Sequence, residues 1–294
     1  MKQTTPNPLL EDLTSFGNNI GLNKFLTYQM KNHLQDYRSI LIDRWKSHAN
    51  RKQTIMATTM VIGDLTGNSD QGWKINFPTD YHFMMNISEI HPKIEILIER
   101  EALRNLAHSY EALEKYLFDI IATYLFTNVS QLRTVINKIK PKEETLESFR
   151  EAIRNLRGRN SAELFKLLRT LAPSFAEAET TNHEAIDLKD WFEVLSLVRH
   201  GIVHSNFTVK KSLRYELTPQ QKKILTRYFP HLETETAYIL QMKYSDVDGQ
   251  FDLILEYGIQ VFKHLSIQKG YHWKVYKYMS GEPLARQLAE NFTN

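Results

Sequence analysis

The chain has 294 residues, which is enough for one large domain or two modest ones. Its 42% hydrophobic and 24% charged residues, with 15 Phe, 14 Tyr and 4 Trp, exclude a disordered or fibrous protein. The absence of cysteine excludes disulfides, thiolate metal sites and a cysteine nucleophile, and a formal net charge of +3 does not by itself indicate a nucleic-acid partner.

The first 93 residues predict an N-terminal extension. Residues 1–20 carry prolines, a glycine and an Asn pair, which predict a loose start. Apolar residues then recur at steps of three and four over residues 22–48, which predicts a helix. Residues 54–87 break that period with β-branched residues and glycines, so we expect a small β-hairpin or an irregular excursion there.

A helical domain is predicted over residues 94–268, followed by a C-terminal tail with a short helix at residues 269–294. The domain opens with a long helix at residues 94–126, whose apolar side chains form one stripe. The fold class expected for the whole chain is therefore mainly α. Further elements are expected in this order: helices at residues 145–156 and 162–171, an acidic loop, a helix capped by Asp187, a helix from Pro219, a strand within 237–244 and a helix at 251–265.

Basic residues are concentrated in two blocks of this domain. Residues 199–228 hold seven Lys or Arg against one acid, and residues 150–169 hold six against two. An acidic connector separates the blocks. The pattern favours an anionic partner, although charge runs are also typical of solvated helix faces.

The helix after the acidic connector places a charged residue where a core residue belongs. On a helical wheel, Arg199 falls about 20° from Leu188, inside the apolar stripe. Because an unpaired buried guanidinium is strongly unfavourable, Arg199 requires a partner, a solvated cleft or a subunit interface. A salt bridge to an acid of the long helix, such as Glu111, is one of these alternatives.

His204 lies about 140° from Arg199 on a continuous helix, so one straight helix would not aim both at one substrate. Two arrangements remove this difficulty. Gly201 ends or bends the helix, or the two side chains converge with their copies from a second protomer.

The stretch Leu197-Val-Arg-His-Gly-Ile-Val-His-Ser-Asn206 resembles the signature of the HEPN family, an Arg followed after four to six positions by a His, with a polar residue directly after the Arg. Arg199 and His204 match the Arg and the His, and His200 occupies the polar position. The family is a helical bundle with a long first helix and a motif near the end of a later one, as predicted here. The resemblance covers roughly residues 94–268.

The resemblance implies a metal-independent endoribonuclease that needs no cofactor, in which the ribose 2′-hydroxyl attacks the adjacent phosphate. Arg199 would hold the phosphate and stabilise its developing charge, and His204 would exchange a proton with the attacking or leaving oxygen. Supporting or RNA-binding roles are expected for a further set of residues: His200, Ser205, Asn206, Glu111, Lys210 and Lys211.

The expected partners also follow from the resemblance. Family members include toxins and antiviral defence effectors, which are often homodimers with a composite active site, so RNA, a second copy of the chain and an antitoxin or other regulatory protein are expected. Only one full motif is present, because Arg104 and His108 stand one residue too close. A composite site therefore requires dimerisation.

Other classes of protein fit the same residues. His200 and His204 have the spacing of a metal-binding pair, but Gly201 stands where the zinc-protease motif has Glu, so we assign no metal. A non-catalytic HEPN-like RNA-binding or protein-interaction module is the alternative function, and a plain scaffold with Arg199 in an internal salt bridge is a third. No apolar run approaches the length that spans a bilayer, so we expect a cytoplasmic protein without a membrane partner.

Overall fold

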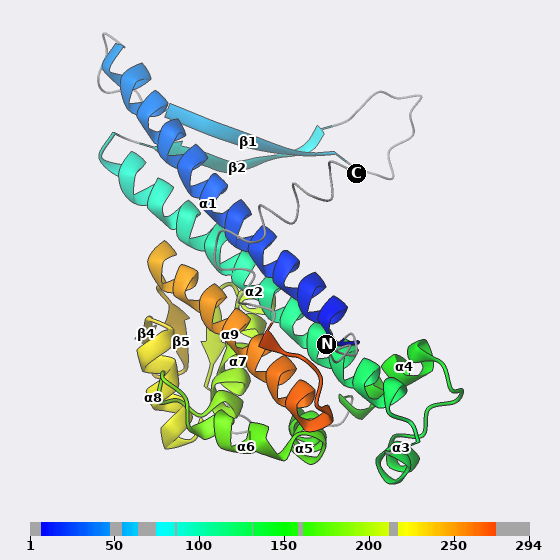
Figure 1. Cartoon of the computed structure of the whole chain (residues 1–294). Helices are drawn as coiled ribbons and strands as arrows, with labels where there is room; N and C mark the ends of the chain where they lie inside the picture. The colour runs from blue at the N-terminus through cyan, green and yellow to red at the C-terminus, as the bar shows by residue number, and fades with distance from the viewer. Residues whose placement is uncertain are drawn as a thin grey trace, which may run out of the picture. The chain divides into compact units, whose positions relative to one another are not determined.

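The computed structural model describes residues 7–47, 55–63, 75–85, 87–130, 132–157, 161–211 and 217–274. The described chain is mainly helical, as the apolar periodicity predicts (Figure 1). It divides into two units by its internal contacts. Unit 1 comprises residues 1–24 and 103–294, and unit 2 comprises residues 25–102. The elements in chain order are α1 (Leu10–Ser47), β1 (Ile55–Gly63), β2 (Ile75–Met85), α2 (Ile87–Thr127), α3 (Arg133–Ile139), α4 (Leu146–Arg157), α5 (Ser161–Leu171), α6 (Pro173–Thr180), α7 (Leu188–His204), β3 (Thr208–Lys210), α8 (Pro219–Tyr228), β4 (His231–Glu233), β5 (Ala237–Leu240) and α9 (Tyr244–Lys269).

Unit 2 contains the antiparallel hairpin of β1 and β2, which is one of the two alternatives predicted for this segment. The predicted boundary between residues 93 and 94 falls inside α2, because this helix begins at Ile87 and continues through Pro92. Ile90, Ile94 and Ile98 are buried at steps of four residues. The apolar face of α2 thus extends across the proline, and burial of that face outweighs the backbone hydrogen bond that proline removes.

The loose start predicted for the first 20 residues is wrong where the structure describes them, from residue 7 on, because α1 begins at Leu10. Phe16 and Ile20 are 2% and 0% exposed, and the Phe16 ring stacks on that of Tyr116 with 4.4 Å between centroids. Burial of these side chains outweighs the roughly 1 kcal/mol by which Gly17 weakens a helix.

The core of unit 1 is built from aromatic side chains of α2, α5, α7 and α9. The ring centroid of Phe192 lies 5.3 Å from that of Tyr110 and 5.1 Å from that of Phe165. Trp191, fully buried, lies 5.9 Å from Tyr257 of α9. Each such ring contributes roughly 1.5–3 kcal/mol by its burial. These contacts fix the rotation of α7 about its axis, and so determine which of its residues face outward.

Several helix boundaries follow local signals. Asp187 caps α7 by accepting a hydrogen bond from the backbone N–H three residues on, at 3.0 Å, and Pro219 begins α8, as predicted. The acidic segment was expected to be a loop, but residues 173–180 form α6. Pro173 stands at the start of this helix, where its missing N–H costs no hydrogen bond. Phe175, in the first turn of the same helix, is fully buried.

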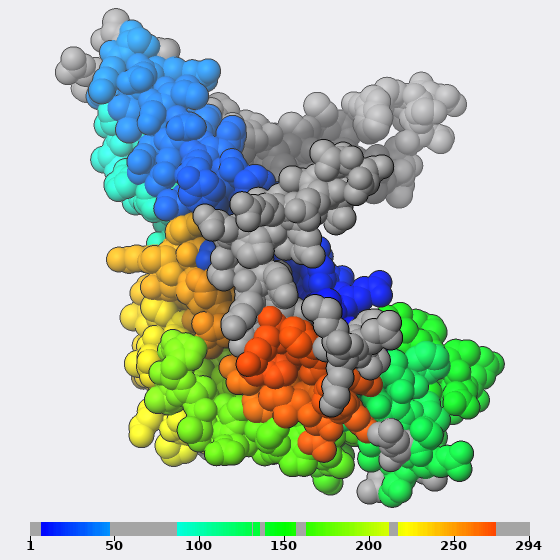
Figure 2. Space-filling model, viewed as in Figure 1, coloured from blue at the N-terminus to red at the C-terminus, as the bar shows by residue number. Residues whose placement is uncertain are grey.

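A small antiparallel sheet, with the strand order β3-β5-β4, lies beside α7 and α8 in unit 1. Val209 pairs with Tyr238, and Leu232 pairs with Ile239. The sequence indicated only β5, which ends at Leu240. α8 and α9 both lie at the surface of unit 1 in the view of Figure 2.

Candidate functional site

α7 is the helix that carries the predicted motif, and it continues through Gly201 to His204. The alternative in which Gly201 ends the helix is therefore wrong. A Cβ atom at this position would lie 2.9 Å from the carbonyl oxygen of Thr208 and 3.0 Å from a methyl of Val209. Gly201 instead allows the backbone of β3 to pass directly against α7.

The turn after α7 redirects the chain into β3. Asn206 and Phe207 have φ angles of 48° and 64°, in the left-handed region, and the N–H of Phe207 donates to the carbonyl of Gly201 at 2.9 Å. Asn tolerates this conformation better than most residues. The structure thus gives Asn206 a role in the turn, and the residue does not line the cavity described below.

Arg199 projects from α7 toward α2 and pairs with Glu111, with Nη2 2.6 Å from Oε1. The alternative of a salt bridge to the long helix is therefore confirmed. The pair is only partly enclosed, because the side chains of Arg199 and Glu111 are 28% and 44% exposed. The hydrogen bond from Arg199 lowers the pKa of Glu111, partial burial opposes that change, and His108, 3.6 Å from the other carboxylate oxygen, reinforces it.

The guanidinium of Arg199 is not saturated by this contact. Its Nε is buried and has no hydrogen-bond partner among the residues that the structure describes. A single carboxylate oxygen therefore holds a group that can donate several hydrogen bonds in one plane. The arrangement orients Arg199 and leaves it able to donate to another acceptor.

His200 and His204 lie on the exposed side of α7, one turn apart. Their ring centroids are 4.9 Å apart with planes inclined at 49°, and both residues are exposed. The described residues contain no group of three or more histidine, aspartate or glutamate side chains placed to hold a metal ion.

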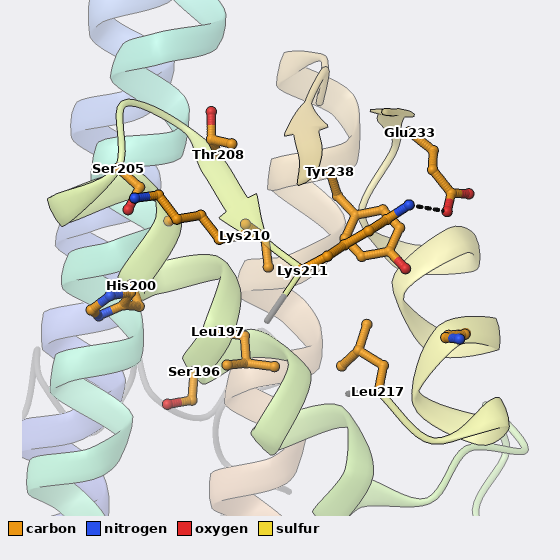
Figure 3. Close-up of a pocket in the computed structure, with 13 residues that line it drawn as sticks. Ser196, Leu197, His200, Ser205, Thr208, Lys210, Lys211, Leu217, Glu233 and Tyr238 are labelled. Carbon is orange, nitrogen blue, oxygen red and sulfur yellow. Dashed lines mark hydrogen bonds and ion pairs between the residues drawn. The ribbon is translucent and has the colours of Figure 1, made fainter. Parts of the chain in front are cut away.

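Next to His200, a cavity of about 660 Å³ opens between α7, α8 and the small sheet (Figure 3). Its walls combine lysines, hydroxyl groups and aliphatic side chains, with one carboxylate. The lining residues are Ser196, Leu197, His200, Gly201, Ser205, Thr208, Val209, Lys210, Lys211, Leu217, Lys222, Glu233 and Tyr238.

The three lysines of the cavity differ in what they contact. Lys211 is held by Glu233 and by the carbonyl of Thr234, both at 2.6 Å, and its ammonium lies 4.8 Å from the centre of the Tyr238 ring. Its hydrogen bond lowers the pKa of Glu233, which keeps that carboxylate charged. Lys210 extends the other way, toward Ser205 (Figure 3). Lys222 joins the cavity from α8.

Six of the eight predicted site residues therefore fall into two groups. Four of them, His200, Ser205, Lys210 and Lys211, line the cavity. Arg199 and Glu111 form a separate pair, and His204 lies next to His200 without lining the cavity.

Sequence reasoning did not assign Lys222 or Tyr238 to the site. Lys222 belongs to the basic block that pointed to an anionic partner, and Tyr238 lies in the predicted strand. Those signals identified the region but not the residues, because the cavity forms only when α8 and β5 pack beside α7.

None of the described helices is both long and apolar enough to cross a membrane. Comparisons with models of protein families, with curated proteins and with solved structures found no match to this chain.

Proposed function

We propose that the protein is a metal-independent endoribonuclease of HEPN type, a class that includes toxins and antiviral defence effectors. The observation that carries the proposal is the placement of Arg199 and His204, partly or fully exposed, on the last turns of α7, with His200 lining a cavity that also holds three lysines. RNA offers phosphates for the guanidinium and for the lysines.

The chemistry follows from the side chains. The 2′-hydroxyl oxygen attacks the adjacent phosphorus, the bond from phosphorus to the 5′ oxygen breaks, and a 2′,3′-cyclic phosphate and a 5′-hydroxyl result. Arg199 stabilises the charge on the phosphoryl oxygens. His204 transfers a proton at the attacking or the leaving oxygen.

One copy of α7 does not direct both groups at the same phosphate. Arg199 contacts α2, and His204 lies about 140° away around a helix that continues between them. A composite site, with Arg199 from one protomer and His204 from its partner, removes this difficulty. The proposal therefore includes a homodimer, and it leaves room for an antitoxin or other regulatory protein that covers the site.

The first test is cleavage of a labelled mixed-sequence RNA in excess EDTA. Replacing Arg199 by Ala should lower the rate about 10²- to 10³-fold, and replacing His204 by Ala about 10²- to 10⁴-fold. Arg133→Ala and His272→Ala, at exposed positions away from α7, are the matched controls. Product ends other than cyclic phosphate, or equal rates in all four variants, would refute the proposal.

Mixing the two inactive variants tests the composite site. If Arg199 and His204 act from different protomers, a dimer of one Arg199→Ala chain and one His204→Ala chain keeps one intact site. Statistical exchange of subunits should then restore about a quarter of the wild-type rate. A mixture that stays inactive although the subunits exchange would show that each site uses one chain alone.

A second function is favoured by one specific contact. The 2.6 Å pair with Glu111 occupies part of the Arg199 guanidinium, as a structural salt bridge would. The contact fits a plain scaffold with Arg199 in an internal salt bridge and, because it leaves the lysines of the cavity untouched, also a non-catalytic RNA-binding or protein-interaction module. Wild-type protein that is dimeric, binds RNA and leaves it uncleaved would establish the RNA-binding form of this alternative.

A further inference from the structure

The residues that line the cavity beside α7 carry more positive than negative charge. Lys211 is paired with Glu233 at 2.6 Å. Lys210 and Lys222 have no ion-pair partner among the residues that the structure describes. With His200 counted as neutral, the lining has an excess of two positive charges. An anion is therefore the favoured occupant.

The cavity also has an apolar wall that an inorganic anion would leave unused. Leu197, Val209 and Leu217 line it together with the ring of Tyr238. A volume of about 660 Å³ is within the usual range of small-molecule sites, roughly 300–1,000 Å³. The occupant that uses both features has an anionic end and a flat body with apolar faces.

Hydroxyl groups complete the lining. Ser196 of α7, Ser205 directly after that helix and Thr208 of β3 each carry a hydroxyl group, which suits the polar edges of a base or a ribose. The hydroxyl of Thr208 also donates to the carbonyl of Asn206 at 3.4 Å. An acidic peptide side chain would satisfy the lysines but present no flat ring to the apolar wall. A nucleotide satisfies the lysines, the hydroxyl groups and the apolar wall together.

We propose that this cavity binds a nucleoside monophosphate group. The phosphate lies at Lys210, Lys211 and Lys222, and the base packs against Leu197, Val209 and Leu217. The group has two possible sources, a free nucleotide or one unpaired nucleotide of an RNA strand. The strand source rests on the proposed function, because His200 lines the cavity and its ring lies 4.9 Å from that of His204.

The binding itself is tested by calorimetry on the full chain with 5′-AMP and 5′-UMP, and with adenosine and inorganic phosphate as comparison ligands. The monophosphates should bind more tightly than either comparison ligand. Binding of adenosine as tight as that of 5′-AMP would overturn the role of the lysines. Binding of inorganic phosphate as tight as that of 5′-AMP would overturn the role of the apolar wall.

Two matched pairs of variants locate the ligand. Lys222→Ala should weaken 5′-AMP binding about tenfold, the change expected for one lost charge-assisted contact. Lys223→Ala makes the same change of charge on the neighbouring exposed residue, which does not line the cavity, and should bind like wild type. Equal affinities in these two variants would overturn the proposal.

The second pair of variants tests a change of affinity in the opposite direction. Glu233→Gln removes the carboxylate that neutralises Lys211, so it should tighten 5′-AMP binding several-fold, whereas Glu235→Gln, an exposed acid that does not line the cavity, should not. Unchanged affinity in Glu233→Gln would contradict binding of the phosphate near Lys211.

Competition separates the two sources and separates this inference from the proposed function. A 2′-O-methyl oligonucleotide cannot undergo 2′-hydroxyl attack, and its displacement by 5′-AMP would identify a strand nucleotide as the occupant. Binding of 5′-AMP without displacement would identify a free nucleotide. Arg199→Ala should keep its affinity for 5′-AMP even where it abolishes cleavage. A wild-type protein that binds 5′-AMP and cleaves no RNA would refute the nuclease alone.

Discussion

The two sides of α7 differ in how far their charges are already satisfied. On the side of α2, Arg199 is oriented by Glu111 and partly enclosed. On the side of the small sheet, Lys210 and Lys222 border a cavity and have no ion-pair partner among the described residues. One side of α7 thus presents a cation held by the fold, and the other side faces lysines of β3 and α8 that are available to a ligand. A sequence motif need not correspond to one site, because adjacent helix positions point about 100° apart.

The largest expected effect comes from the core that supports both sides. Phe192→Ala should lower the free energy of unfolding by about 3–5 kcal/mol, because it empties a fully packed aromatic position between α2, α5 and α9. Urea denaturation measures this change. Ile239→Ala, at a side chain that is 38% exposed, is the control and should change stability much less. Similar losses in the two variants would mean that Phe192 is not a core residue.

A smaller effect should be confined to the side of the sheet. Gly201→Ala places a Cβ within 2.9 Å of the Thr208 carbonyl and should cost about 1–3 kcal/mol by forcing β3 away from α7. Gly249→Ala in α9 is the matched control, because no other atom of the described residues lies within 4 Å of its new Cβ, and it should stabilise the protein by about 0.4–1 kcal/mol. Thermal unfolding of both variants should show a loss of stability in the first and a gain in the second. A Gly201→Ala protein as stable as wild type would contradict the close approach of β3 to α7.

The smallest effect concerns the side of α2. Glu111→Gln should lower stability near neutral pH by at most about 1 kcal/mol, since the ion pair is partly exposed. The pKa of Glu111 is lower in the folded chain than in the unfolded one, so its contribution is complete above the unfolded pKa and is lost as pH falls through the folded one. The stability difference between wild type and variant should therefore shrink between about pH 6 and pH 3.

The control for this last experiment is Glu235→Gln, which changes the charge equally at an exposed position where no ion pair is found among the described residues. Its difference from wild type should stay small across the same range of pH. A pH dependence equal to that of Glu111→Gln would mean that the Arg199 pair contributes nothing specific.

The sequence predicted those features that depend on local signals. Asp187 and Pro219 mark helix starts through their own chemistry, and both starts are confirmed. The start of α1 was missed because Gly17 and the Asn pair argue locally against a helix, whereas the burial of Phe16 that favours one involves a distant partner, Tyr116. Propensity was outweighed there by tertiary packing.

The candidate site likewise has one part that the sequence predicts and one part that it does not. The pairing of Arg199 was predictable because a charge in an apolar stripe needs a partner, and Glu111 stood on the helix that the stripe faces. The cavity was not predictable, because its walls include β3 and β4, each only three residues long. Strands of that length carry no detectable alternation, so nothing in the sequence places Lys222 and Ser205 in one cavity.

The contact at Gly201 also has a mechanical consequence. With no side chain between them, α7 and β3 meet backbone to backbone, and a helix in such contact transmits displacement rather than absorbing it. A ligand that pushes β3 outward would therefore strain the last turn of α7, where His204 is carried. Gly201 and Thr208 would in this way link the position of β3 to that of His204.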